Sequence, residues 1–380
     1  MSNKIGNPFI INGKYVSAEY FCDRKVETAE MVSNIVNWRN TVLISSRRMG
    51  KSGLIEHVFA QPSVCDNFVT MYVDVFETSN LSEFVFLLGK EIMNRLQSRS
   101  DKLRDKFLSI VSSIKAGIEI DNVSGLPSVQ FSLGSINAPQ KSLEQIFEFL
   151  EASEIPCVVA IDEFQQLAEY KEGGKLIASL RSLVQSCRQT RFIFAGSNRR
   201  MMGKLFNSPS EPFFMSCTPL YVEAINRSEY KEFAGGHFQN AYKRIDDECF
   251  DYVYDVFEGH TWYVQYVLNR LFEETYTGGC AVLVDAVRAI NYILDIYHRT
   301  FQEMMLHFSD KQKTLLIAVA KEGKASGLSG LKFISEHGLG SASSVQGAAR
   351  PLLADETIVR EDGQYRISNR FFSMWLARRY

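Results

Sequence analysis

The stretch Thr41–Gly53, with the sequence TVLISSRRMGKSG, decides the fold of this chain. Its first residues, Thr41 to Ile44, have strand-forming side chains, and a short polar loop follows that ends in Gly50-Lys51-Ser52. The next stretch, Leu54–Phe59, is helix-like. A strand, a tight loop with Gly-Lys-Ser and a helix predict a phosphate-binding loop, in which N–H groups and a lysine hold phosphates and a hydroxyl meets Mg²⁺. The residues that we expect around the phosphates are Ser45, Ser46, Arg47, Arg48, Met49, Gly50, Lys51, Ser52 and Gly53.

The loop departs from the usual pattern at its first position, where Ser45 stands in place of a glycine. A Gly-Lys-Ser tripeptide also occurs by chance in ordinary loops. The loop alone therefore leaves two interpretations open, and other parts of the chain have to decide between them.

The composition is that of an ordinary globular protein, with 46% hydrophobic and 23% charged residues. A length of 380 residues predicts two or three domains. The net charge of −2 argues against general coating of nucleic acids or binding to acidic membranes. It does not exclude a local basic patch that binds nucleic acid. No apolar run approaches the roughly 18 residues of a membrane span.

Seven cysteines are scattered along the chain without the spacing of a metal site. They predict free thiols in a reducing compartment. The first residues, Met1 to Pro8, are polar and lack an apolar signal core. We therefore expect a cytoplasmic protein that does not contact a membrane.

A second stretch, Ile155–Phe164, is an apolar run that ends in the carboxylates Asp162 and Glu163. Such a run is typical of a strand buried on both faces of a parallel sheet, and ligands of open α/β sheets bind at the carboxyl ends of the strands. We predict that Asp162 joins Ser52 in the Mg²⁺ shell and that Glu163 polarises the attacking water. The alternative is a strand that merely ends in a polar turn.

A third buried strand, Arg191–Asn198, ends in small polar residues. We expect it to lie between the other two strands, so that Ser197 or Asn198 can sense the γ-phosphate; the alternative is a simple turn. Val69–Val75 and Leu220–Val222 are further strands, and the alternation with helices predicts a parallel, doubly wound α/β sheet. Between them we expect a helix at Leu103–Ile114 and a hairpin insertion at about residues 117–133.

The chain becomes helical after Ile225. The predicted helices of a small bundle are Ser228–Ala241, Asp246–Phe257, Trp262–Thr275 and Val282–Phe301, with a break at Gly259-His260. From Asp310 onward, three predicted helices and a hairpin around Asp362-Gly363 indicate a winged helix. This region holds eleven Lys and Arg against seven Asp and Glu, yet its candidate recognition helix carries only Arg350. DNA binding and a protein-packing or regulatory role both stay open.

Together these stretches resemble the AAA+ P-loop ATPases, and more closely the prokaryotic branch called archaeal-type ATPases, which is allied to the STAND signalling NTPases. The resemblance covers nearly the whole chain. It rests on Asn7-Pro8-Phe9, Arg24, Arg47-Arg48-Met49-Gly50-Lys51-Ser52, Asp162-Glu163, Gly196-Ser197, Gly259-His260 and the winged helix.

The resemblance implies a P-loop NTPase core at residues 1–224 with sheet order 5-1-4-3-2, a helical lid at 225–308 and a winged helix-turn-helix domain at 309–380. It further implies that ATP or ADP binds with Mg²⁺ between core and lid. Phe21 and Arg24 would border the adenine and His260 would face the nucleotide, although Thr261 replaces the proline usual after that histidine. Ring-forming members present an arginine just before the last strand to a neighbour's ATP, but between Met201 and Thr218 this chain has only Lys204. Arg199 and Arg200, just upstream, are the nearest candidates.

The leading hypothesis is an ATP-binding, slowly hydrolysing molecular switch that acts on a protein partner that the sequence does not identify. Two alternatives come from other classes. One is a DNA-binding regulator, similar to an initiator, for which ATP is an effector. The other is a nucleotide binder without turnover, which the Ser45 substitution makes conceivable.

Overall fold

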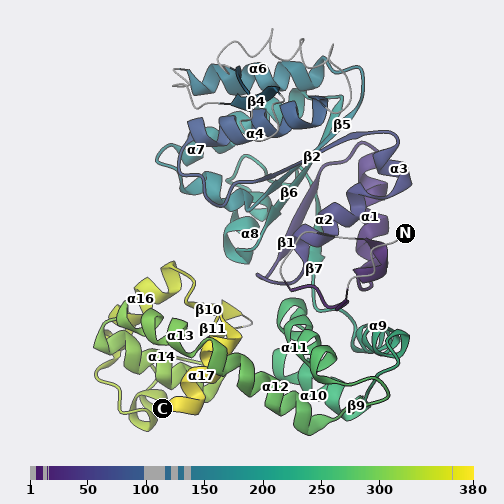
Figure 1. Cartoon of the computed structure of the whole chain (residues 1–380). Helices are drawn as coiled ribbons and strands as arrows, with labels where there is room; N and C mark the ends of the chain where they lie inside the picture. The colour runs from purple at the N-terminus through teal and green to yellow at the C-terminus, as the bar shows by residue number, and fades with distance from the viewer. Residues whose placement is uncertain are drawn as a thin grey trace. The chain divides into compact units, whose positions relative to one another are not determined.

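The computed structural model describes residues 6–11, 15, 17–97, 116–120, 127–131, 138–361 and 363–380. The chain forms two compact units (Figure 1). The core unit is the described part of Asn12–Glu229, and the C-terminal unit joins the described part of Met1–Ile11 to Tyr230–Tyr380. The chain therefore passes from one unit to the other twice.

A five-stranded parallel sheet is the centre of the core unit, in the order β2-β5-β6-β1-β7. If these five strands are numbered 1 to 5 along the chain and the order is read from β7 to β2, it is the predicted order 5-1-4-3-2. The third buried strand, β6, lies between β5 and β1, as expected. The strands are β1 Thr41–Ser45, β2 Val69–Asp74, β5 Cys157–Asp162, β6 Thr190–Gly196 and β7 Thr218–Val222.

Helices cover both faces of this sheet (Figure 1). One face carries α1 Lys25–Val36, α2 Lys51–Phe59 and α3 Pro62–Cys65. The other carries α4 Leu81–Gln97, α6 Pro139–Glu151, α7 Gly173–Ser186 and α8 Arg199–Asn207. The short 3-10 helices are η1 Ala18–Tyr20 and η2 Phe164–Glu169. Neither α3 nor α8 was expected from the sequence.

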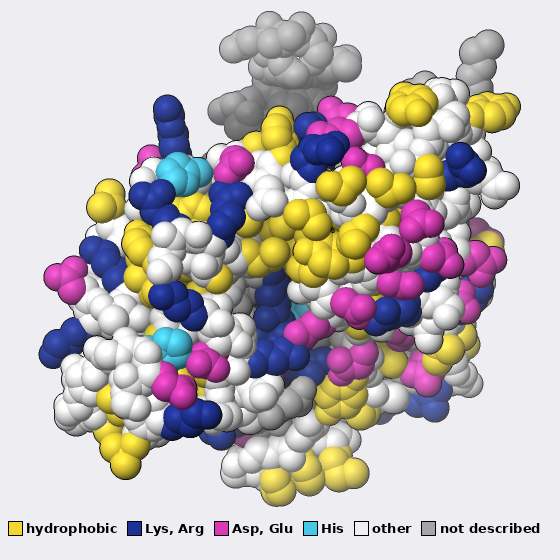
Figure 2. All heavy atoms as spheres, turned by 90° about the horizontal axis from the view of Figure 1, so that it is seen from below, with side chains coloured by type: hydrophobic (Ala, Val, Ile, Leu, Met, Phe, Trp, Pro, Cys, Tyr) yellow, Lys and Arg dark blue, Asp and Glu magenta, His cyan; other side chains and the backbone are white. Residues whose placement is uncertain are grey.

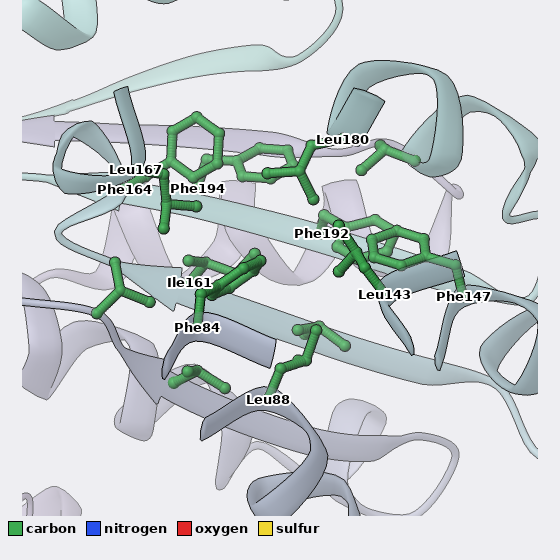
Figure 3. Close-up of a cluster of buried hydrophobic side chains, with 14 of the residues drawn as sticks. Phe84, Leu88, Leu143, Phe147, Ile161, Phe164, Leu167, Leu180, Phe192 and Phe194 are labelled. Carbon is green, nitrogen blue, oxygen red and sulfur yellow. The ribbon is translucent and has the colours of Figure 1, made fainter. Parts of the chain in front are cut away.

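The pleat of the strands divides their side chains between two hydrophobic cores. In β6, Phe192 and Phe194 enter the core beneath α4, α6 and α7, whereas Ile193 and Ala195 enter the core beneath α1 and α2. Successive strand residues point to opposite faces, so a strand covered on both sides has to be apolar throughout. Figure 3 shows the first of these cores, where the Phe194 ring lies 4.7 Å from that of Phe164.

The expected hairpin insertion is present, with β3 Ala116–Ile120 antiparallel to β4 Pro127–Phe131. The predicted helix Leu103–Ile114 and the end of the predicted hairpin at Leu133 lie outside the described residues.

The first part of the C-terminal unit is a helical bundle with α10 Asp247–Phe257, α11 Thr261–Glu274, α12 Leu283–Ile296 and α13 His298–Leu306. Helix α9, Arg227–Asn240, begins in the core unit and continues into this bundle. The prediction of one helix over Val282–Phe301 is wrong, because Tyr297 leaves helical geometry and separates α12 from α13. The strands β8 Arg244–Ile245 and β9 Cys280–Ala281 were not expected, since two residues are too short to show a period-two pattern.

A winged helix follows, with α14 Asp310–Glu322, α15 Leu331–Glu336, α16 Ala342–Ala354, β10 Ile358–Glu361 and β11 Gln364–Ile367. Ser341 caps α16 through its hydroxyl, which accepts from the Ser344 N–H, as its position predicted. The last helix, α17 Arg370–Arg379, was missed. It packs against α12 and α14 and buries Phe371, Phe372, Trp375 and Leu376.

The segment Asn7-Pro8-Phe9 belongs to the bundle. Asn7 donates to the carbonyl of Asn269 at 2.9 Å, and Asn269 donates back to the carbonyl of Phe9 at 2.6 Å. The Phe9 ring is fully buried among aromatic rings that include Phe238 and Phe272. All seven cysteines are free thiols, and no described helix is long and apolar enough to cross a membrane.

Candidate active site

The loop between β1 and α2 has the backbone that its sequence predicts. Gly50 has φ +86°, a left-handed conformation that residues with a Cβ rarely adopt. Helix α2 begins at the next residue, Lys51, so the free N–H groups of its first turn lie at the loop.

Ser45, the residue that replaces the usual glycine, is the last residue of β1 and pairs in register with Val222 of β7. Its backbone is therefore extended, and this position does not need the conformational freedom of glycine. The side chain is buried, and its hydroxyl has no hydrogen-bond partner among the residues that the structure describes.

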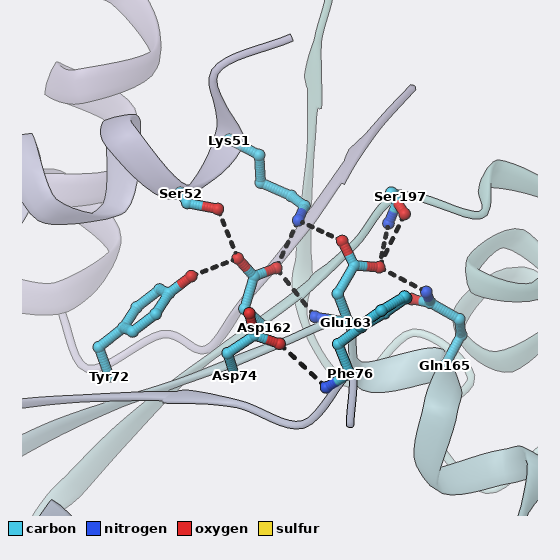
Figure 4. Close-up of polar contacts among 9 residues, drawn as sticks. All are labelled: Lys51, Ser52, Tyr72, Asp74, Phe76, Asp162, Glu163, Gln165 and Ser197. Carbon is cyan, nitrogen blue, oxygen red and sulfur yellow. Dashed lines mark hydrogen bonds and ion pairs between the residues drawn. The ribbon is translucent and has the colours of Figure 1, made fainter. Parts of the chain in front are cut away.

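Lys51 lies between the two carboxylates that end β5 (Figure 4). Its ammonium group contacts Asp162 Oδ1 and lies 3.1 Å from Glu163 Oε1. Burial would lower the pKa of Lys51, but the attraction of the two carboxylates outweighs it, so that this pKa is raised. The loop lysine and the two carboxylates singled out in the sequence therefore lie together at the carboxyl end of β5.

The Asp162 carboxylate is almost fully buried and receives four donors. Lys51 and the Glu163 N–H donate to Oδ1. The hydroxyls of Ser52 and Tyr72 donate to Oδ2 at 2.7 and 2.6 Å. Burial alone would raise the pKa of Asp162, yet Lys51 and the other donors hold it below its usual value, so the group is ionised at neutral pH.

Glu163 follows with φ +55°, a conformation that is costly for a residue with a Cβ and that clusters at functional sites. Its Oε2 accepts from the Ser197 hydroxyl at 2.7 Å, the Ser197 N–H at 3.3 Å and the Gln165 amide at 2.6 Å. Burial acts to raise the pKa of Glu163, but Lys51 and the Gln165 and Ser197 side chains lower it overall. The carboxylate is therefore ionised and turned toward Lys51.

Three residues of this cluster were not found from the sequence. Tyr72 lies in β2 and reaches Asp162 because β2 pairs with β5 in parallel, with Asp74 level with Asp162. Burial raises the pKa of Asp74, which accepts from the Phe76 N–H at 2.9 Å. Gln165 lies in the 3-10 helix after Glu163. Neither the register between β2 and β5 nor a short 3-10 helix leaves a periodic signal in the sequence. Only the expected parallel pairing of β2 could have pointed to Tyr72.

Phe21 and Arg24, which are predicted to border the adenine, lie next to the same loop. The buried Arg24 guanidinium donates to the Met49 carbonyl at 3.2 Å and to Glu27 at 2.8 Å. The Phe21 ring lies against Gly53, where an added Cβ would be 3.7 Å from it. Phe21 also stacks on the His57 ring at 4.2 Å.

Other predicted site residues have different surroundings. The Arg47 guanidinium lies 5.7 Å from the centre of the Phe76 ring, and Arg48 has φ +65°. The Asn198 side chain caps α8 by accepting from the Met201 N–H at 2.9 Å. His260 stands before α11 in the C-terminal unit, so its role toward a nucleotide in the core unit stays a prediction.

A parallel sheet in this order, with Lys51 and Ser52 at the start of the helix after β1 and Asp162 and Glu163 at the end of β5, two strands away across β6, defines a P-loop NTPase. Residues 21–267 match the family described as "ATPase domain predominantly from Archaea", and the chain belongs to this family. It is an ATPase. Residues 299–378 match a "Probable winged helix domain", in agreement with the predicted winged helix.

Several solved structures share this fold. The Walker-type ATPase PABY2304 of Pyrococcus abyssi is 17% identical, with a TM-score of 0.65 over 97% of this chain and 99% of that one. The Aeropyrum pernix ORC2 protein, solved in ADPNP-ADP complexes, is 11% identical with a TM-score of 0.59 over 98% and 95% of the two chains. The Aeropyrum pernix ORC1 protein in complex with DNA is 11% identical, with a TM-score of 0.52 over 94% and 93%. No curated protein matches the chain.

Proposed function

We propose that this protein is a Mg²⁺-dependent ATPase whose nucleotide state switches the arrangement of its two compact units. The observation that carries the proposal is the buried cluster in which Lys51 and Ser52 contact Asp162 and Glu163 at one edge of the sheet. Phosphoryl transfer to water needs a loop that holds the phosphates and acidic groups beside it that bind the metal and orient the water. The cluster supplies both.

The phosphates of ATP are held by the N–H groups of the loop and of the first turn of α2, and by the Lys51 ammonium group. In the structure Lys51 is paired with two carboxylates, so binding ATP exchanges these partners for phosphate oxygens. Glu163 is ionised and can therefore accept a proton from the attacking water, and its hydrogen bonds to Ser197 and Gln165 fix its orientation. Ser197 donates a hydrogen bond to Glu163, and this contact supports the proposed role of Ser197, with Asn198 beside it, as a sensor of the γ-phosphate.

Ser52 and Asp162 fit a magnesium ion. Their side-chain oxygens are 2.7 Å apart and are hard donors of the kind that Mg²⁺ prefers. Within the described residues, no group of three or more His, Cys, Asp or Glu side chains could hold a metal by itself, so phosphate oxygens and water have to complete the shell. When bound, Mg²⁺ neutralises charge on the β- and γ-phosphates.

The switch part of the proposal rests on the covalent connections between the units. The chain crosses between them at residues 11 and 12 and again at residues 229 and 230. A nucleotide held by the core unit, with Phe21 and Arg24 beside the adenine, binds one arrangement of the units better than another and so shifts their equilibrium. A protein partner that binds only one of these arrangements would then respond to the nucleotide.

A DNA-binding regulator is the second candidate. It is favoured by the charge of the winged helix, eleven Lys and Arg against seven Asp and Glu from Asp310 onward, and by the similarity to the ORC1 protein solved with DNA. The face in Figure 2 shows basic and acidic side chains together, without one continuous basic surface. A gel shift of the full chain on duplex DNA at low and high salt separates the candidates, because DNA binding would weaken steeply as salt is added.

The catalytic assignment is tested by Glu163→Gln. We expect ATP binding to be retained, because the amide still fits the site, and hydrolysis to fall by about a hundredfold or more, because the general base is lost. Glu172→Gln, at a side chain 72% exposed, is the matched control and should hydrolyse ATP as the wild type does. Equal turnover in wild type and Glu163→Gln would refute the role of Glu163. A wild type that binds ATP but shows no turnover would favour the nucleotide binder.

A further inference from the structure

We infer that Gln165 is a positioning residue that holds the Glu163 carboxylate in its productive orientation. The inference rests on the proposed role of Glu163 as the general base. Gln165 Nε2 donates to Glu163 Oε2 at 2.6 Å, and this amide comes from the 3-10 helix that directly follows Glu163 (Figure 4).

The two oxygens of Glu163 face different partners. Oε2 is held by Gln165 and by the side chain and N–H of Ser197, whereas Oε1 is directed to Lys51 at 3.1 Å. Fixing Oε2 from the side away from the phosphate loop leaves Oε1 turned toward the place where phosphate and water bind. A general base acts efficiently only when such an orientation is set before the reaction.

The surroundings of Gln165 indicate that its amide is present for this hydrogen bond and not for packing. The side chain is only 7% exposed, and its carbonyl oxygen Oε1 has no hydrogen-bond partner within the described part of the chain. A buried, unpaired oxygen is unfavourable, so an apolar side chain of the same length would fill the position at least as well. The donor group bonded to Glu163 is therefore the part of Gln165 that packing does not explain.

Gly196, at the end of β6, makes room for this amide. A Cβ at Gly196 would lie 2.4 Å from Gln165 Oε1 and 2.5 Å from Met202 Sδ, closer than real contacts. Because Met202 is buried in the core, the Gln165 side chain is the group that would have to move. Gly196→Ala should therefore displace the amide from Glu163 although neither Gln165 nor Glu163 is itself substituted.

The main test is Gln165→Met, which keeps the length and removes the donor. We expect kcat for ATP hydrolysis to fall between about tenfold and about a hundredfold, with KM changed by less than about twofold and the melting temperature not lowered. Gln166→Met is the matched control. It is the neighbouring residue, its amide donates to the Thr78 carbonyl at 3.2 Å, and we expect its kcat to equal that of the wild type.

Two outcomes of these assays would overturn the inference. One is a kcat for Gln165→Met equal to that of Gln166→Met. The other is a loss of kcat accompanied by a raised KM and a lowered melting temperature, which would indicate general damage to the site. Gly196→Ala should lower kcat in the same range, and a fully active Gly196→Ala whose crystal structure shows the Gln165–Glu163 hydrogen bond broken would also overturn the inference.

A double variant links the effect to Glu163. In the Glu163→Gln background, Gln165→Met should change the residual rate by less than about twofold, because there is no longer a base to orient. An equal loss in both backgrounds would show that Gln165 acts elsewhere.

A crystal structure of Gln165→Met decides the inference without relying on turnover. We expect the Glu163 carboxylate to rotate away from Lys51, and an unchanged carboxylate would overturn the inference. If wild type and Glu163→Gln hydrolyse ATP equally, the proposed function fails, yet this crystal structure still shows whether Gln165 orients Glu163.

Discussion

Replacing the phosphate-loop lysine should destabilise the nucleotide-free protein, and not only weaken its hold on ATP. Lys51 contacts both Asp162 and Glu163, and its own side chain is only 7% exposed. Lys51→Met keeps the length of the side chain but leaves two carboxylates beside each other, one of them 2% exposed, without a compensating charge.

The size of the effect follows from this burial. Removing one partner of a buried ion pair costs about 3–5 kcal/mol, because the remaining charge is desolvated and unpaired. The hydroxyls of Ser52 and Tyr72 still donate to Asp162, so we expect the lower end of that range, about 3 kcal/mol. This is a large part of the free energy of unfolding of an ordinary domain, about 5–15 kcal/mol.

The loss should depend on pH with a definite sign. In the wild type the pKa values of Asp162 and Glu163 lie below their ordinary values, so their contribution to stability is complete above those ordinary values and is lost only as pH falls through the lowered ones. Without Lys51, burial becomes the dominant cause and raises both pKa values. As the pH falls toward about 5, protonation then removes the buried charges of the variant, and the difference in the free energy of unfolding between variant and wild type narrows.

The measurement is urea unfolding of the nucleotide-free proteins, followed by circular dichroism at pH 7.5 and pH 5. Lys175→Met is the control, since this side chain is 82% exposed and lies 3.1 Å from Glu172, itself 72% exposed, and an exposed pair contributes less than about 1 kcal/mol. A Lys51→Met variant that loses no more than the control at pH 7.5 would refute the reasoning. So would a loss that stays constant between the two pH values.

Three further perturbations test other parts of the structure. Tyr72→Phe removes one donor from Asp162, so the Mg²⁺ concentration for half-maximal hydrolysis should rise about tenfold, while ATP binding without Mg²⁺ stays unchanged; an unaltered Mg²⁺ titration would contradict it. Gly50→Ala places a Cβ at φ +86°, so calorimetry should show a stability loss of about 1–2 kcal/mol and weaker ATP binding, and full ATP affinity would count against a rigid loop. Phe194→Ala opens a cavity in the core of Figure 3 and should cost about 3–5 kcal/mol in urea unfolding, whereas Phe76→Ala, at a residue 52% exposed, should cost far less; similar losses would contradict the burial.

Much of the core unit could be predicted because its signals are local. The apolar runs of β1, β5 and β6 are long enough to show that these strands are buried on both faces. The same pattern correctly predicted that the sheet lies between two layers of helices. Boundaries were less accurate, and Tyr297 shows the reason: apolar spacing continues across it from α12 into α13, although the backbone breaks there. Helix α17 was overlooked although Phe371, Phe372, Trp375 and Leu376 have helical spacing.

The sequence by itself determined the phosphate loop and the acidic pair, because strand, turn and helix propensities place Lys51 and Ser52 at the start of a helix and the two carboxylates at the end of a strand. Only the tertiary structure decided how the acidic pair is held. Tyr72 reaches Asp162 through the parallel register of β2 and β5, and Gln165 reaches Glu163 through one irregular turn beside Gly196. The first contact depends on the register of two strands that lie far apart in the chain, and the second on a short irregular turn, and neither leaves a periodic signal in a single sequence.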